Sequence, residues 1–166
     1  MGYEEGKATT TNGTRVERTS DRELVVTRTF NAPPRIVFAA WTTPELFMRW
    51  WALKSSGVPM LSCDMDVRTG GGYRVEFGRD PATAMAFYGK YLEVIPNARL
   101  VWTNEEGGED GSVTTVTFEE KDGRTLLVMS ELYPSKEALD AAGTGAADAT
   151  HETFGQLDDL LAQLHV

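Results

Sequence analysis

Short strand-like runs follow one another through most of this chain, and a single long amphipathic pattern ends it. Residues 24–30 form one such run. From Val58 onward, alternating apolar and polar residues recur between turns rich in glycine, proline or asparagine. We count seven strands, and neighbours joined by such short turns pair antiparallel. Residues 146–164 place Phe154, Leu157 and Leu161 at helical spacing. Since the apolar face of the sheet and the apolar stripe of the helix must cover each other, we predict an α+β fold in which a seven-stranded curved antiparallel sheet wraps around a long C-terminal helix.

Two short helices are predicted between the first and second strands. Pro33 and Pro34 end the first strand, because proline cannot join a ladder but suits the first turn of a helix. Apolar residues then recur at helical spacing up to Trp41. Thr43 and Pro44 begin the second helix, with Thr43 as its N-cap.

The first twenty residues differ from the rest in composition. They are rich in threonine, glycine and charged residues and contain almost no bulky apolar side chains. Burial there cannot offset the entropy of ordering the chain, so we expect a flexible tail over residues 1–20 and one domain over residues 21–166.

Charge and cysteine content restrict the partners and the compartment. The formal net charge is −9 and no basic cluster is present, which argues against nucleic-acid binding and against docking on an anionic membrane. No apolar run is long enough to span a bilayer, so we expect no membrane insertion. Cys63 is the only cysteine and cannot form an internal disulfide, which fits a reducing compartment and favours the cytoplasm.

An ordered set of short motifs is similar to a known family. The motifs, in chain order, are Val26-Thr27-Arg28, Phe30, Ala32-Pro33, Val37-Phe38, Trp41-Thr42, Pro44-Glu45, Trp50-Trp51, Met65-Asp66, Arg68, Gly70-Gly71, Gly89, Tyr91, Arg99-Leu100-Val101 and Pro134-Ser135. Together they resemble the bacterial relatives of the activator of the heat-shock-protein-90 ATPase, in the START-like (SRPBCC, Bet v 1-like) superfamily. The resemblance extends over residues 22–164. It implies a helix-grip fold, with a deep apolar cavity between the sheet and the last helix.

We expect the ligand-binding residues to be mainly aromatic or apolar side chains on the strands and on the last helix. Aromatic side chains with a polar tip suit a pocket that encloses an apolar ring and fixes one polar group. Trp50 and Trp51 occupy adjacent helical positions, so one should pack in the core and the other should lie near the mouth of the pocket. The candidates are Trp50, Trp51, Met65, Tyr73, Val75, Phe77, Phe87, Tyr91, Trp102, Met129, Glu131, His151 and Phe154.

Two ionisable candidates could orient or activate a ligand. Glu131 shares one face of the last strand with Met129 and Tyr133, so a carboxylate enters the cavity if that face looks inward. His151 lies at the edge of the apolar stripe of the last helix. Both residues also fit ordinary positions, Glu131 near a strand end reaching solvent and His151 half-exposed on the surface.

We expect no metal and no cofactor. Two histidines and one cysteine at distant positions give no metal-ligand spacing. Cys63 alternates with Met65 and Val67, which is typical of a small buried hydrophobe rather than a nucleophile. The three glycines at 70–72 join two strands and do not open a helix, so they form a turn and not a phosphate cradle.

The sequence is compatible with three functions. We favour a non-catalytic protein that binds a small hydrophobic molecule. The alternatives are a cofactor-independent cyclase, dehydratase or hydrolase acting on a polyketide-like substrate, and an interaction domain of co-chaperone type. The enzyme hypothesis requires Glu131 and His151 to converge on one bound molecule. Apolar residues on both faces of residues 126–133 are compatible with a weak homodimer.

Overall fold

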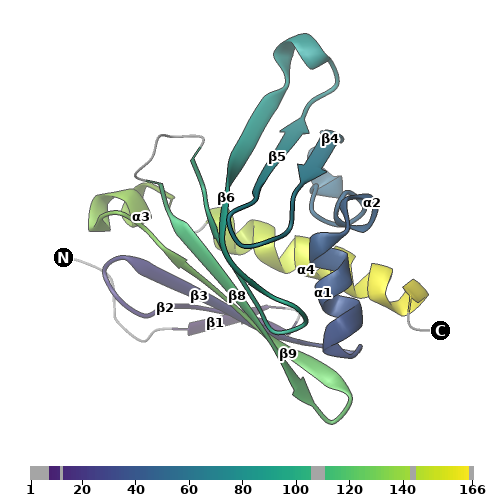
Figure 1. The fold of residues 1–166 in the computed structure, drawn as a ribbon. Helices are drawn as coiled ribbons and strands as arrows, with labels where there is room; N and C mark the ends of the chain where they lie inside the picture. Colours follow the sequence, from purple (N-terminus) through teal and green to yellow (C-terminus); the bar gives the residue numbers. More distant parts are fainter. Residues whose placement is uncertain (1–7, 12, 106–110, 143–144, 165–166) are drawn as a thin grey trace.

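The computed structural model describes residues 8–11, 13–105, 111–142 and 145–164. A curved antiparallel sheet wraps around the C-terminal helix α4, and two short helices close one end (Figure 1). The predicted helix-grip fold is confirmed. The elements are β1 Ala8–Thr11, β2 Thr14–Arg18, β3 Glu23–Phe30, α1 Pro34–Thr42, α2 Pro44–Phe47, β4 Met60–Met65, β5 Gly72–Phe77, β6 Met85–Ile95, β7 Arg99–Thr103, β8 Val113–Lys121, β9 Arg124–Leu132, α3 Lys136–Ala142 and α4 Gly145–Leu164.

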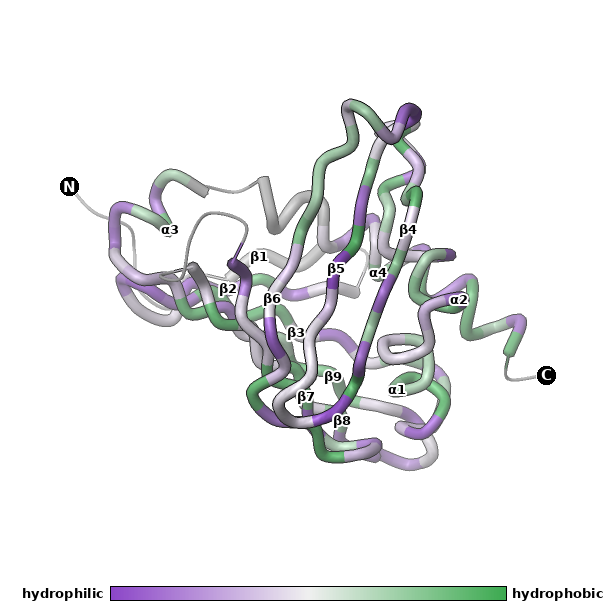
Figure 2. The backbone as a smooth tube through the Cα atoms, turned by 45° about the horizontal axis from the view of Figure 1, so that its top comes forward, coloured by the Kyte–Doolittle hydropathy of each residue, from purple (hydrophilic) through white to green (hydrophobic). Residues whose placement is uncertain are grey.

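All neighbouring strands pair antiparallel, in the order β1-β2-β3-β9-β8-β7-β6-β5-β4. The long strand β3 therefore lies beside the last strand, β9, and the segment holding α1 and α2 crosses from there to the far edge at β4. Apolar and polar residues alternate along β4 and β5, visible as alternating green and purple in Figure 2. This alternation gives the sheet one face toward the helix and one toward solvent.

The sheet has nine strands rather than seven, because two strands form where we expected a flexible tail. The seven predicted strands correspond to β3 through β9. β1 and β2 form an added hairpin whose second strand pairs with β3, placing Val16 opposite Val26. Threonine is β-branched and favours strands, and the Asn12-Gly13 dipeptide is a strong hairpin signal that overall composition does not reveal. Gly13 has φ +82°, which glycine adopts without strain.

Gly89 in β6 is required by close packing. A Cβ at this position would collide with the backbone carbonyl of Thr103 on β7. The register irregularity of β6 lies close by, between Tyr91 and Glu93, where β6 pairs with β7.

The core lies where α1, α4 and the inner face of the sheet meet. Phe30 on β3 packs edge-to-face on Phe154 of α4, with ring centroids 5.4 Å apart. Leu157 and Leu161 of α4 are buried as the stripe predicted. Trp50 is fully buried, and its indole Nε1 donates to the carbonyl of Ala40 at 2.9 Å. Burying Trp50 in this way ties the segment after α2 to α1.

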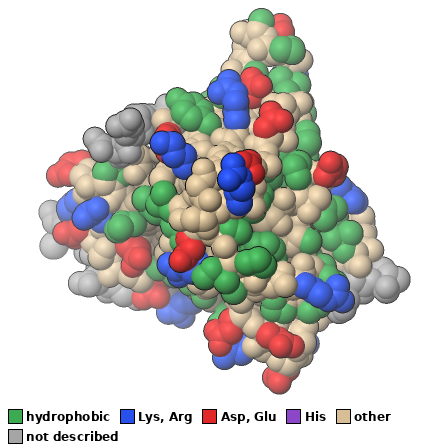
Figure 3. All heavy atoms as spheres, viewed as in Figure 1, with side chains coloured by type: hydrophobic (Ala, Val, Ile, Leu, Met, Phe, Trp, Pro, Cys, Tyr) green, Lys and Arg blue, Asp and Glu red, His purple; other side chains and the backbone are tan. Residues whose placement is uncertain are grey.

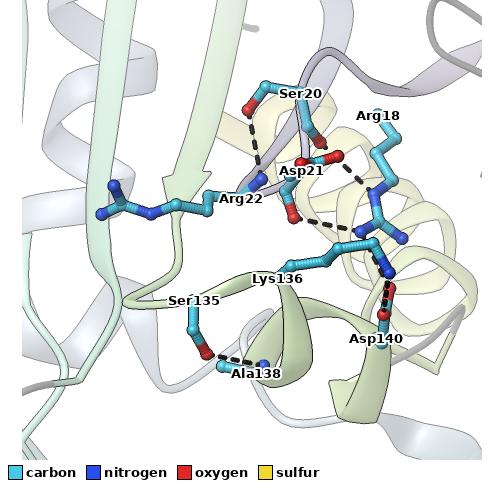
Figure 4. A network of polar contacts seen from close by, with 8 residues as sticks. All are labelled: Arg18, Ser20, Asp21, Arg22, Ser135, Lys136, Ala138 and Asp140. Carbon is cyan, nitrogen blue, oxygen red and sulfur yellow. Dashed lines mark hydrogen bonds and ion pairs between the residues drawn. The ribbon is translucent and has the colours of Figure 1, made fainter. Parts of the chain in front are cut away.

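A polar network fastens the turn before β3 to helix α3 (Figure 4). Arg18 donates to the carbonyls of Ser20 and Asp21 and forms an ion pair with Asp140 at 2.8 Å. Lys136 reaches the same carboxylate, one helical turn away on α3. The two cations hold the pKa of Asp140 below its ordinary value, chiefly through the hydrogen bonds from Lys136 and Arg18. Ser135 caps α3, its hydroxyl accepting from the amide of Ala138 at 3.1 Å.

Within the described residues, no helix is both long enough and apolar enough to cross a membrane. Hydrophobic side chains lie scattered among charged ones of both signs on the face shown in Figure 3.

Candidate functional site

A cavity of about 610 Å³ lies between the inner face of the sheet, the segment after α2 and the first half of α4. Aromatic and aliphatic side chains make up most of its wall. The described lining residues are Trp41, Phe47, Trp51, Leu53, Ser56, Val58, Met65, Tyr73, Val75, Phe77, Met85, Phe87, Tyr91, Leu100, Trp102, Asn104, Met129, Glu131, Thr150 and Thr153. The volume falls within the range of about 300 to 1,000 Å³ that is typical of small-molecule sites.

The structure brings most of the sequence candidates together on this wall. The ten candidates that line the cavity are Trp51, Met65, Tyr73, Val75, Phe77, Phe87, Tyr91, Trp102, Met129 and Glu131. Nine of them lie on strands, where the alternation of side chains fixes which residues face inward.

Three candidates lie elsewhere. Trp50 and Phe154 are fully buried in the core, where their rings pack with Trp41. As expected, one tryptophan of the adjacent pair, Trp50, packs in the core, and Trp51 lines the cavity. His151 is half-buried and is not among the described lining residues, because its neighbour Thr150 occupies the cavity-facing position of α4.

Ten lining residues are not among the candidates predicted from the sequence. Three of them, Leu53, Ser56 and Val58, belong to the segment between α2 and β4, where no periodicity fixes side-chain direction. Thr150 belonged to the recognised helical pattern but was not selected. The others are Trp41, Phe47, Met85, Leu100, Asn104 and Thr153.

Side chains of α4 hold the segment after α2 in place. Gln156 donates through Nε2 to the carbonyls of Trp50 at 2.7 Å and Ala52 at 2.8 Å, and its Oε1 accepts from the amide of Lys54 at 2.9 Å. Glu152 accepts from the amide and the hydroxyl of Ser55, and these hydrogen bonds lower its pKa. Because this segment carries Trp51, Leu53 and Ser56, the contacts fix one wall of the cavity.

The end of the β5–β6 hairpin projects from the rest of the sheet (Figure 1). The cavity reaches the surface beside it, where lining residues are exposed. Met85 and Val58 line the cavity and are 63% and 39% exposed. Phe77 and Phe87 pack edge-to-face beside them, with ring centroids 5.5 Å apart. An apolar mouth of this kind offers a ligand a low-cost path from the surface to the interior.

A chain of hydrogen bonds runs along the polar end of the cavity. The Tyr73 hydroxyl donates to the carbonyl of Thr103 at 2.8 Å and lies 3.2 Å from Oδ1 of Asn104. Nδ2 of Asn104 donates to the Thr114 hydroxyl at 3.0 Å, and Thr114 in turn lies 3.5 Å from Oε1 of Glu131. These residues place amide, hydroxyl and carboxylate groups on one side of a mainly apolar space.

The carboxylate of Glu131 also accepts from the hydroxyl of Tyr133 at 2.9 Å. Burial and the neighbouring carboxylate raise the pKa of Tyr133, so this hydroxyl remains a neutral donor at physiological pH. Burial likewise raises the pKa of Tyr91, which lines the cavity and is only 3% exposed. Since Glu131 lines the cavity, its position on the inner face of β9 turns the carboxylate toward that space.

The remaining reactive groups in the described part of the chain do not gather into a candidate metal site. Burial, reinforced by Asp64, raises the pKa of Cys63 to about 11, so its nucleophilic thiolate form is scarce at neutral pH. No group of three or more histidine, cysteine, aspartate or glutamate side chains among the described residues could hold a metal ion. The pair required by the enzyme hypothesis is not assembled on the described cavity wall, since Glu131 lines it and His151 does not.

Comparison with known proteins agrees with this architecture. The model of a family described as "Activator of Hsp90 ATPase homolog 1-like protein" matches residues 31–162. No curated protein matches the chain.

Several solved structures share the fold. A crystal structure of a Rhodobacter sphaeroides protein has a TM-score of 0.82 at 27% identity, covering 91% of this chain and 99% of that one. A Mycobacterium smegmatis protein has a TM-score of 0.78 at 24% identity, covering 96% and 100%. The solution structure of an AHSA1-like protein from Aeromonas hydrophila has a TM-score of 0.67 at 17% identity, covering 85% and 94%.

Proposed function

Since the chain belongs to the family of Activator of Hsp90 ATPase homolog 1-like proteins, which have a START-like fold, we propose that it binds a small lipophilic or aromatic molecule in the cavity between the sheet and α4. The observation that carries this proposal is the cavity of about 610 Å³ with its mainly apolar wall. We also propose a cytoplasmic location, from the single cysteine.

Burial supplies the driving force for such binding. Each square ångström of apolar surface removed from water contributes about 25 cal/mol, so a ligand that buries about 200 Å² gains about 5 kcal/mol before the cost of immobilisation. The aromatic side chains of Trp51, Trp102 and Tyr73 provide flat surfaces for a ring. The polar end of the cavity, at Asn104 and Glu131, provides groups that could orient such a ligand.

The first experiment is native mass spectrometry of the protein purified gently from its own host, to detect a molecule that travels with it. The second is a fluorescence titration with the neutral probe N-phenyl-1-naphthylamine. We expect saturable binding with one site per chain.

A matched pair of variants locates the site. Met129→Trp fills the cavity from the inner face of β9, whereas Val128→Trp adds the same ring on the opposite face of the same strand. We expect Met129→Trp to lower probe affinity at least tenfold and Val128→Trp to leave it unchanged, with circular dichroism confirming that both variants fold. Equal affinity in the two variants, or no saturable binding to the wild type, contradicts the proposal.

A further inference from the structure

A short exposed segment borders the mouth of the cavity. Residues 55–58 follow the stretch of backbone that Gln156 holds, and all four are exposed. Ser56 and Val58 line the cavity from this position. Because Val58 is itself 39% exposed, the segment buries little apolar surface where it lies against the cavity. Few buried contacts and an exposed backbone are typical of segments that open locally at low cost.

The chain on either side of these four residues is held more firmly. Before them, Trp50 is fully buried, and Gln156 fixes the backbone that follows it. After them, Met60 is buried and begins β4. Residues 55–58, which we call the mouth segment, therefore lie between two fixed points. Gly57 within it has φ +68°, a left-handed conformation that glycine enters and leaves without steric cost.

Two polar contacts hold the mouth segment against its neighbours, one from each side. From α4, Glu152 accepts from the amide of Ser55 at 3.0 Å and from its hydroxyl at 2.7 Å. From the loop after β5, the Arg79 guanidinium donates to the carbonyl of Gly57 at 2.8 Å. These contacts lie at the surface, so water replaces each partner when the segment moves away.

We propose that the mouth segment is a lid, which opens between the backbone held by Gln156 and the start of β4, and which closes through Glu152 and Arg79. This inference rests on the proposed function, because it concerns how a molecule enters and leaves the same cavity. The wall that carries Trp51 stays in place during opening, since Gln156 holds it independently of the two lid contacts.

A lid of this kind separates the rates of binding from the affinity. The contacts of Glu152 and Arg79 lie outside the cavity wall, so they are the same whether the cavity is empty or occupied. A contact that stabilises the closed lid equally in both states slows entry and exit by the same factor and leaves Kd unchanged.

Stopped-flow fluorescence with N-phenyl-1-naphthylamine tests this separation, because it measures the association and dissociation rate constants, whose ratio gives Kd. Glu152→Ala removes the contact from α4, and Arg79→Ala removes the contact from the loop after β5. The matched control is Asp159→Ala, which removes the same charge as Glu152→Ala from an exposed position on the same helix. Circular dichroism should confirm that all three variants fold.

We expect Glu152→Ala to raise both rate constants about fivefold, because two hydrogen bonds to a carboxylate hold the lid closed, and Arg79→Ala to raise both about threefold. Kd should change by less than about twofold in each variant. Asp159→Ala should match the wild type in both rate constants.

Two outcomes overturn this inference and leave the proposed function standing. In the first, either Glu152→Ala or Arg79→Ala binds and releases the probe at the rates of the control. In the second, dissociation alone becomes faster and Kd weakens by the same factor, which would mean that these contacts hold the occupied cavity together without governing entry. If the wild type shows no saturable binding of the probe, the cavity is not a site for such molecules, and the proposed function falls together with the inference.

Discussion

A substitution of Gln156 tests whether hydrogen bonds or side-chain packing hold the segment after α2 in place. Gln156 is only 8% exposed, and its side chain makes three hydrogen bonds to the backbone between Trp50 and Lys54. The substitution Gln156→Leu keeps a similar volume and removes all three bonds. The segment that forms one wall of the cavity then loses its attachment to α4.

The size of the expected loss in stability depends on the backbone groups that lose their hydrogen bonds to Gln156. A typical hydrogen bond contributes about 1 kcal/mol net, and a buried group left without a partner costs at least as much. Trp50 is fully buried, so its carbonyl cannot turn to water, whereas Lys54 is exposed and its amide can. We therefore expect Gln156→Leu to lower the free energy of unfolding by about 3 kcal/mol.

Equilibrium unfolding in urea measures this loss directly, followed by circular dichroism at 25 °C. In a domain of this size, about 3 kcal/mol corresponds to a fall in Tm of about 6 to 12 °C. The matched control is Gln163→Leu on the same helix. Gln163 is exposed and accepts from Arg49 at 2.6 Å, so its loss should change stability by less than about 0.5 kcal/mol.

The reasoning is refuted if Gln156→Leu costs less than about 1 kcal/mol, or no more than Gln163→Leu does. Either result would mean that the segment after α2 is held by the packing of its tryptophans, and that the three hydrogen bonds merely replace equivalent bonds to water.

Three further predictions concern other parts of the molecule. Because the pKa of Cys63 is about 11, iodoacetamide at pH 8 should alkylate it far more slowly in the folded protein than in urea, measured by mass spectrometry; equal rates would contradict its burial. The lowered pKa of Asp140 means that its contribution to stability is present above its unfolded pKa and is lost as pH falls through the folded value, so Asp140→Asn should flatten the dependence of Tm on pH at the acid end; an unchanged profile would show that the ion pair with Arg18 adds nothing. Gly89→Ala should destabilise the fold by about 2 kcal/mol or more in the urea assay, because its Cβ meets the carbonyl of Thr103; a neutral effect would show that β6 and β7 can move apart.

Local periodicity was sufficient to predict the strands from β3 to β9 and the long helix. Alternation along one strand decides which side chains share a face, and helical spacing decides the buried stripe of α4. Phe77 and Met129 line the cavity, as this reasoning predicts once the family resemblance supplies the cavity itself. The β1–β2 hairpin was missed because composition was weighed above the Asn12-Gly13 turn signal, although that signal is as local as the others.

The rest of the site depends on contacts that no local pattern contains. Leu53 and Val58 lie in an irregular segment whose direction is set by Gln156, about a hundred residues away in the chain. The polar chain from Tyr73 to Glu131 requires the exact pairing of β7, β8 and β9. Register of this kind is fixed by the whole sheet together with its turns, and a single-strand pattern cannot supply it.

This register also explains why the cavity has one polar end. On the inner face of β7, β8 and β9, one row across the sheet is entirely apolar, and the next row along the strands is mixed. The apolar row is Leu100, Val116 and Met129; the next is Trp102, Thr114 and Glu131. A slip of one residue in any of the three strands would turn its inward side chains to the other face and break up both rows. The polar end of the cavity is therefore a property of strand pairing, and a substitution that disturbs the register of these strands should break it up.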